Sequence, residues 1–174
     1  MKLLFEMDKK DYKIDGEVFS RPSVRAIIIN DNKIAMVYSK KYNYYKFPGG
    51  GINKGEDNMD ALVREVKEET GLIVKRDTIK EYGYVIRKEK GDFTDIFLQE
   101  NYYYLCDVEK EVGLQHLDDY EFEEGFSLRW VRPDVAIDIN LNHDHYGFYD
   151  LNILTRDSKI LEILRDSKVI NLLF

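Results

Sequence analysis

The sequence has few of the features that build cross-linked or membrane-spanning proteins. Its 174 residues include a single cysteine, Cys106, which excludes an intrachain disulfide and a cysteine-rich zinc site. The chain has no uninterrupted apolar run of about 18 residues, the length that spans a bilayer. The opening residues, MKLLFEMDKKDYK, combine a short apolar run with early acidic residues, unlike a secretion signal. We therefore expect a soluble protein in the reducing cytoplasm, with no membrane partner.

Basic residues are also too scarce for a protein that binds polyanions over a broad surface. The chain has 26 lysines and arginines against 33 aspartates and glutamates, which gives a formal net charge of −7. General binding to nucleic acid needs a basic surface. We therefore expect a small-molecule partner and no nucleic acid. An anionic substrate would need a metal ion and a few basic side chains around it.

What the sequence does contain fits one folded domain. Apolar residues make up 44% and charged residues 34% of a chain long enough to bury a hydrophobic core. Residues 1–22 alternate apolar and polar side chains around Asp15-Gly16, which predicts a small hairpin or an added edge strand. Residues 24–29 and 34–38 predict a second hairpin in the core of the sheet. Further strands are expected over residues 79–87, 93–108 and 126–131.

Helices are expected in the centre and in the last third of the chain. The central helix should begin near Asp57 or Asn58, either of which can cap it, and should end at Gly71. The acidic residues 115–125 contain little that must be buried and predict a loop. Pro133 then opens the next helix.

The last helix is expected to begin at Tyr149. It carries a short echo, in which Arg156-Asp157-Ser158-Lys159 returns as Arg165-Asp166-Ser167-Lys168. The spacing is too short for a stacked repeat, so we interpret the echo as a marker of helix boundaries, with the second Asp-Ser as a break or a cap. Because no linker divides the chain, we expect one domain over residues 1–174, with an N-terminal hairpin and a C-terminal helix added to it.

Three glutamates would give the central helix a concentrated negative edge. Glu65, Glu68 and Glu69 stand at positions i, i+3 and i+4, on one side of a helix. Like charges at these spacings destabilise a helix unless something neutralises them, and a divalent cation is the obvious candidate. A solvated helix is the alternative for an isolated EVKEE pattern. The apolar stripe is expected about a quarter turn away, at Met59, Val63 and Val66.

The wider pattern resembles a known family. Gly50, five residues, Glu56, seven residues and then REVKEETGL, ending at Leu72, match the Nudix box at its fixed positions. The preceding Phe47-Pro48-Gly49 and the strand order extend the resemblance. It implies an α/β fold, an α/β/α sandwich around a mixed sheet, and hydrolysis of a nucleotide pyrophosphate with Mg²⁺, or with Mn²⁺. Asn53 departs from many members, which have a glutamate there, and this could alter the number of metals.

The resemblance also implies roles for the residues of the box. Glu68 and Glu69 would be the main metal ligands, with Glu65 as a ligand or as the base, and Gly49 would offer its backbone carbonyl. Mg²⁺ prefers carboxylate oxygens and keeps water and substrate phosphates in its other positions. Arg64 stands four residues before Glu68 and can hold it in position.

In some members of the family a glutamate from a later loop joins the site. Here Glu124-Gly125 precedes Trp130 in the acidic stretch and resembles that arrangement, so Glu124 is a candidate metal ligand and catalytic residue. Glu121 and Glu123 are alternatives. A solvated acidic loop is the plain explanation for all of them.

Weaker candidates for contact with the substrate lie outside the helix. The glycines around Gly50 allow the backbone to approach a phosphate closely. Surface or packing positions are the commoner explanation for the basic and aromatic candidates. His143 and His145 have no further ligand cluster nearby, so a zinc site is not expected. The candidates for phosphate are Arg25, Lys46 and Arg87, and those for stacking on a base are Tyr45 and Tyr102, with Tyr44 and Tyr104 beside them.

The preferred function is hydrolysis of a nucleoside diphosphate linked to another moiety, by water attack on the diphosphate. A proline some way beyond the box marks many ADP-ribose hydrolases, and Pro22, Pro48 and Pro133 do not provide it. The first alternative is therefore a MutT-like nucleoside triphosphate pyrophosphohydrolase acting on modified nucleotides. The second is a non-catalytic, nucleotide-sensing Nudix module. The sequence leaves the oligomeric state open, a homodimer included.

Overall fold

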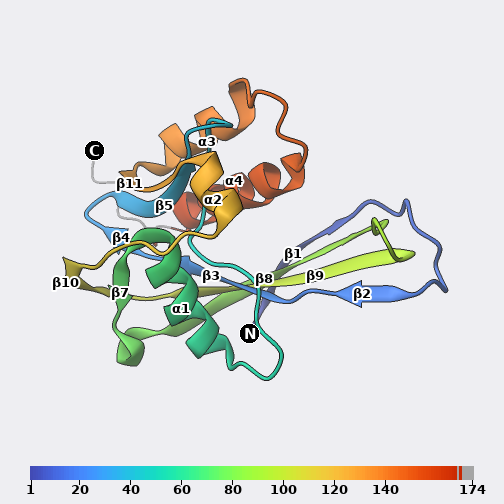
Figure 1. Cartoon of the computed structure of the whole chain (residues 1–174), viewed down its shortest axis with the longest axis horizontal. Coiled ribbons are helices and arrows are strands. Elements are labelled where there is room, and N and C mark those ends of the chain that lie inside the picture. Colours follow the sequence, from blue (N-terminus) through green and yellow to red (C-terminus); the bar gives the residue numbers. More distant parts are fainter. Residues whose placement is uncertain (168, 170–174) are drawn as a thin grey trace.

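The computed structural model describes residues 1–167 and 169 and shows a mixed α/β fold, as expected (Figure 1). The helices are α1 (Asn58–Thr70), η1 (Arg76–Thr78), α2 (Asp119–Glu124), α3 (Pro133–Asn142) and α4 (Leu151–Asp166). The strands are β1 (Leu3–Asp8), β2 (Val18–Ser20), β3 (Ser23–Ile27), β4 (Ile29–Asn30), β5 (Lys33–Ser39), β6 (Tyr44–Lys46), β7 (Leu72–Val74), β8 (Lys80–Glu89), β9 (Ile96–Leu105), β10 (Val108–Val112) and β11 (Phe126–Val131). In the described part of the chain no helix is both long and apolar enough to cross a membrane.

The largest sheet is built on the long antiparallel pair β8 and β9. Strand β1 lies parallel to β8 on one edge, and β2 and β3 lie parallel to β9 on the other. The ends of β8 and β9 extend with β1 and β2 beyond the helices as an arm (Figure 1). Of the two expectations for residues 1–22, the structure therefore confirms the added edge strand and contradicts the hairpin. The pair of β8 and β9 alone would expose unpaired backbone N–H and C=O groups on both of its edges. Strand β1 pairs with the edge of β8, and β2 pairs with the edge of β9.

The hairpin expected over residues 24–38 is split between two sheets. Strand β3 pairs with β9, whereas β5 pairs with β4, β6 and β11 in a second sheet. The chain changes sheet at Ile28, whose carbonyl accepts a hydrogen bond from the Ala35 amide. Every residue of β3 is buried, as is typical of a strand covered on both faces. Only the short β4 forms the hairpin with β5.

Helix α1 begins and ends as predicted, and of the expected apolar stripe Val66 is buried and Val63 packs against the core, whereas Met59 does not. Asp57 caps it by accepting the Met59 amide at 2.8 Å, and Gly71 ends it with φ of +74°. Met59 itself is 39% exposed. The helix is rotated so that part of its negative edge points inward. Its buried residues are Ala61, Leu62, Val66, Glu69 and Thr70.

The acidic stretch before β11 is a helix rather than a loop. Helix α2 covers residues 119–124, and the Glu121 carboxylate accepts the Asp118 amide at 2.9 Å. This aspartate followed three residues later by a glutamate is a start signal that the high acidity of the stretch concealed. Strand β11 and the start of α3 at Pro133 agree with the predicted positions.

The two copies of the sequence echo lie on different faces of helix α4. Asp157 is fully buried, whereas the Asp166 side chain is 70% exposed. Their nine-residue separation is two and a half turns, about 900°, so the two residues lie on opposite faces. The Ser167 amide donates to the Ile163 carbonyl at 3.0 Å at the helix end, so the second Asp-Ser marks the end of α4. Lys168 lies outside the described residues.

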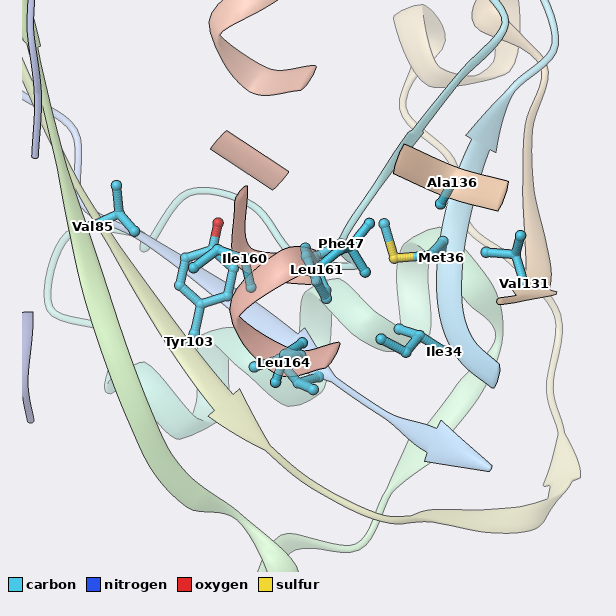
Figure 2. Packing of buried hydrophobic residues seen from close by; sticks show 11 residues of the cluster. Ile34, Met36, Phe47, Val85, Tyr103, Val131, Ala136, Ile160, Leu161 and Leu164 are labelled. Atoms are coloured by element: carbon cyan, nitrogen blue, oxygen red, sulfur yellow. The ribbon is translucent and has the colours of Figure 1, made fainter. Parts of the chain in front are cut away.

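Two hydrophobic clusters lie on the two faces of β9. Tyr103 points into a cluster with Ile160, Leu161 and Leu164 of α4 (Figure 2). The next residue, Tyr104, belongs to a cluster that includes Leu62 of α1. Because neighbouring strand residues face opposite sides of a sheet, α1 and α4 cover opposite faces of this one. The site described below lies where both helices reach the same loop.

Candidate active site

The site is organised around residues 47–51, Phe47-Pro48-Gly49-Gly50-Gly51, which we call the glycine segment. It runs antiparallel to β3. The amide of Val24 donates to the Gly50 carbonyl at 3.0 Å, and that of Ala26 donates to the Pro48 carbonyl at 2.8 Å. The segment therefore extends the largest sheet beyond β3, on the side of β3 that faces away from β9.

Two positions of this segment require glycine. Gly49 has φ of +136°, and a Cβ atom there would lie 2.1 Å from the carbonyl oxygen of Val24. A Cβ atom on Gly50 would lie 2.2 Å from a carboxylate oxygen of Glu65. The backbone thus approaches both the sheet and the glutamates of α1 more closely than any side chain would allow.

Glu69 is the most buried carboxylate of the negative edge. It is 1% exposed, accepts the Gly49 amide at 2.8 Å and forms an ion pair with Lys46 at 2.5 Å. Burial raises the pKa of Glu69 to about 7, although the Lys46 ammonium and the Gly49 amide act in the opposite direction. Lys46, predicted to meet a phosphate, here neutralises a predicted metal ligand.

Arg64 holds the remaining carboxylates together. Its Nη1 atom donates to Glu65 at 2.6 Å and to Glu68 at 3.1 Å, so the expected contact with Glu68 is present. The other guanidinium nitrogens bind Glu56 at 2.7 and 2.8 Å and the Gly51 carbonyl at 3.1 Å. Arg64 lowers the pKa of Glu56 to about 2, whereas burial raises that of Glu65.

These oxygen donors are of the kind that Mg²⁺ prefers. A cation would also stabilise the ionised carboxylates of Glu65 and Glu69, which burial disfavours. Among the described residues, however, no three acidic, histidine or cysteine side chains already form a group that could hold a metal. Arg64 and Lys46 neutralise the carboxylates instead. The donor set therefore fits the metal chemically, and binding at Glu69 would require Lys46 to move away from that carboxylate.

Glu124 and Glu121 occupy different environments at the end of α2. Both Ser39 and Tyr44 donate to Oε2 of Glu124, at 3.1 and 2.9 Å. Glu121 is 5% exposed, accepts the Tyr120 hydroxyl, and its charge helps to raise the pKa of Glu69. Glu121 therefore acts electrostatically on Glu69 of the negative edge. From the sequence, Glu121 is only an alternative to Glu124.

The structure separates the three basic candidates. Arg25 is buried and donates to the Gly49 carbonyl, the group that the family resemblance assigns to the metal. Lys46 lies nearby against Glu69. Arg87, in contrast, lies on β8 and forms ion pairs with Glu89 and with Asp150, the latter at 2.8 Å. Two of the three candidates thus lie at the glycine segment, while Arg87 is paired near the start of α4.

The aromatic candidates lie on different sheets. The ring of Tyr45 packs 4.9 Å from that of Tyr38 in the second sheet. Tyr102 lies on β9, with its ring 6.0 Å from that of Tyr84. Tyr44 is buried near Glu124, and the Tyr104 hydroxyl accepts a hydrogen bond from Asn58. They form no common surface for a base.

His145 and Cys106 have structural surroundings of their own. The ring nitrogens of His145 contact the backbone carbonyls of Tyr42, Asn43 and Asn140, so this histidine holds loops together. Cys106 is buried, and burial raises its thiol pKa to about 12, so the reactive thiolate is disfavoured.

Sequence reasoning missed a second carboxylate at the glycine segment. Asp157 of α4 accepts the Phe47 amide at 3.0 Å and the Tyr103 hydroxyl at 3.1 Å. A signal was present, because Asp157 stands at helical spacing from buried leucines, in the middle of an apolar stripe. These leucines are Leu154, Leu161 and Leu164.

Comparison with known proteins identifies the family of the chain. An ADP-ribose pyrophosphatase of Methanocaldococcus jannaschii is 40% identical over 146 residues, covering 79% of this chain and 78% of that protein. Nudix hydrolase 2 of Arabidopsis thaliana is 37% identical over 83 residues, 44% of this chain, and the chain spans only 30% of its length. The crystal structure of a MutT NUDIX hydrolase from Burkholderia pseudomallei shares the fold, with a TM-score of 0.52 at 19% identity over 67% of this chain and 85% of that one. The model of the NUDIX domain matches residues 19–151, so the chain belongs to the Nudix family.

Proposed function

We propose that this chain hydrolyses a nucleoside diphosphate linked to another moiety, with Mg²⁺ as the cofactor and Mn²⁺ as a substitute. One observation carries the proposal. Glu65, Glu68 and Glu69 share one edge of α1, and Glu65 and Glu69 lie directly against a backbone segment in which two glycines permit unusually close approach. Hard oxygen donors beside such a backbone suit a metal that carries phosphate oxygens.

The chain's own residues would divide the work. Bound Mg²⁺ would neutralise the diphosphate and lower the pKa of the attacking water. Glu68 and Glu69 would hold it, with Gly49 offering its carbonyl. Glu65, whose pKa burial raises, is suited to take the proton from the water. Arg64 would keep Glu65 and Glu68 in place during the reaction.

The reaction breaks one phosphorus–oxygen bond of the anhydride. Water adds to one phosphorus, the bridging oxygen leaves with the other, and two phosphorylated halves result. The substrate class is supported by the similarity to a protein named ADP-ribose pyrophosphatase, which extends over most of both chains. Arg25 and Lys46 lie at the glycine segment and are the basic residues best placed to meet the diphosphate once metal binding releases them.

Product identity on a panel of nucleotides tests the proposal. Purified protein would be incubated with ADP-ribose, nucleotide sugars, dinucleoside polyphosphates and nucleoside triphosphates, with Mg²⁺ or with Mn²⁺. We expect a nucleoside monophosphate and the phosphorylated other half from the first three groups. Release of pyrophosphate from triphosphates alone would favour the MutT-like alternative. Binding without turnover across the panel would favour the sensor.

A further inference from the structure

A buried polar network connects α4 to the glycine segment. Asp157 accepts hydrogen bonds from the Phe47 amide at 3.0 Å, from the Tyr103 hydroxyl at 3.1 Å and from Nε of Arg156 at 2.8 Å. Asp157, Tyr103 and Arg156 are each at most 1% exposed. An ion pair in such a place is costly to desolvate and is kept only when its hydrogen bonds are well made.

The same network reaches the other end of the segment. Nη1 of Arg156 donates to the side-chain oxygen of Asn101 at 2.7 Å, and the Ser23 hydroxyl donates to that oxygen at 2.8 Å. Ser23 in turn is the β-bridge partner of Gly51. The first residue of the glycine segment is thus bound directly by α4, and the last is reached through Asn101 and Ser23.

Between these two ends lies Gly49, whose backbone belongs to the site. Its amide binds Glu69, and its carbonyl accepts a hydrogen bond from Arg25. The φ of +136° at Gly49 is a conformation that glycine enters and leaves easily. Fixed neighbours are therefore needed to hold this residue in one orientation.

We propose that Asp157, supported by Arg156 and Tyr103, is a positioning residue that fixes the glycine segment so that Gly49 and Glu69 face the metal. This inference rests on the proposed function for its catalytic consequence. Asp157 itself lies behind the segment and touches neither metal nor substrate. Outer groups that orient ligands in this way commonly change metal affinity or activity by about 10- to 100-fold when removed.

The sequence echo supplies a matched control for the test. Asp157→Asn keeps the size of the side chain and removes its charge. Asp166→Asn makes the identical change in the same local sequence of α4, on the exposed face. Each variant would be compared with the wild type by amide hydrogen exchange at residues 47–51, by Mn²⁺ affinity without substrate, by kcat and KM, and by thermal unfolding.

We expect Asp157→Asn to accelerate exchange at Gly49 and to weaken Mn²⁺ binding by about tenfold. We expect kcat to fall about 10- to 100-fold with KM within twofold, because misplaced groups cost most in the transition state. Asp166→Asn should match the wild type. A variant Asp157→Asn with lowered thermal stability but unchanged Mn²⁺ affinity and kcat would overturn the proposal, since its role would then be structural alone.

A second variant covers the case in which Asp157→Asn does not fold. Tyr103→Phe removes one hydrogen bond to Asp157 and keeps the packed ring. We expect a loss of about threefold in both Mn²⁺ affinity and kcat, and no loss in either would overturn the proposal. Wild-type protein that turns over no compound of the panel would overturn the proposed function instead, and exchange and Mn²⁺ binding would still decide the positioning role.

Discussion

Two buried carboxylates reach the glycine segment from opposite faces of one sheet. Glu69 of α1 accepts the Gly49 amide, and Asp157 of α4 accepts the Phe47 amide two residues earlier. The counter-charge of Glu69 is Lys46, a single ammonium group from β6. Asp157 is bound by its own neighbour Arg156 and by a tyrosine in the packed core.

This difference in partners suggests that one carboxylate takes part in the chemistry and the other holds the backbone in position. A metal ion can replace a lysine ammonium at a carboxylate, because the ammonium is a single charge on a long, mobile chain. A carboxylate bound by a guanidinium, a core hydroxyl and a backbone amide has no such exchangeable partner. We therefore propose metal binding for Glu69 and fixation of the backbone for Asp157, and the following changes test that division.

The largest effect is expected from Glu69→Gln. The amide can still accept the Gly49 hydrogen bond, so the fold should persist, but the charge that binds a metal is lost. We expect kcat to fall about 10²–10³-fold, as for the loss of one well-placed electrostatic group. Steady-state kinetics with a circular-dichroism check of folding would measure this. Activity close to that of the wild type, in preparations checked for metal content, would remove Glu69 from the metal site.

The second prediction concerns the stability of the metal-free protein. The pKa of Glu69 is raised from 4.5 to about 7, so the folded state binds more protons than the unfolded state between these values. The free energy of unfolding should therefore fall as pH rises through this window. For Glu69 the loss is on the order of 3 kcal/mol.

Urea unfolding at pH 4.5 and at pH 8 measures this loss, with Glu69→Gln as the control. The variant lacks the titrating group, so its stability should decrease less over the same interval. Mg²⁺ at pH 8 should return part of the lost stability to the wild type, because it favours the ionised carboxylate. Equal pH dependence in the two proteins would show that Glu69 does not titrate there.

The sequence identified Glu69 but not Asp157, and the reason is physical. The Nudix box and the caps at Asp57 and Gly71 are local, so their spacing alone fixes the helix and its negative edge. The burial of Asp157 depends on partners 54 and 110 residues away, at Tyr103 and Phe47. Long-range pairing also decides between the two expectations for residues 1–22, because their strands pair with β8 and β9 as edge strands rather than with each other as a hairpin.

A smaller effect should distinguish the two glutamates of α2. Ser39 and Tyr44 both donate to Oε2 of Glu124, so Oε1 would be the oxygen through which this residue takes part in the reaction. We expect Glu124→Gln to lower kcat about tenfold. Glu121→Gln removes a charge that raises the pKa of Glu69, so it should shift the stability transition to lower pH. Full turnover by Glu124→Gln would remove this residue from the mechanism.

The smallest effect is expected at the exposed half of the echo in α4. Asp166 is 70% exposed, and its ion pair with Arg165 at 3.0 Å is solvated. Its negative charge also lies at the C-terminal end of the helix, where the dipole disfavours it. Asp166→Ala should therefore change the free energy of unfolding by less than about 0.5 kcal/mol.

The same substitution at Asp157 should cost about 3–5 kcal/mol, because it leaves Arg156 buried without its partner. Urea titrations of the two variants give both values, and similar losses would show that burial does not separate the two halves of the echo.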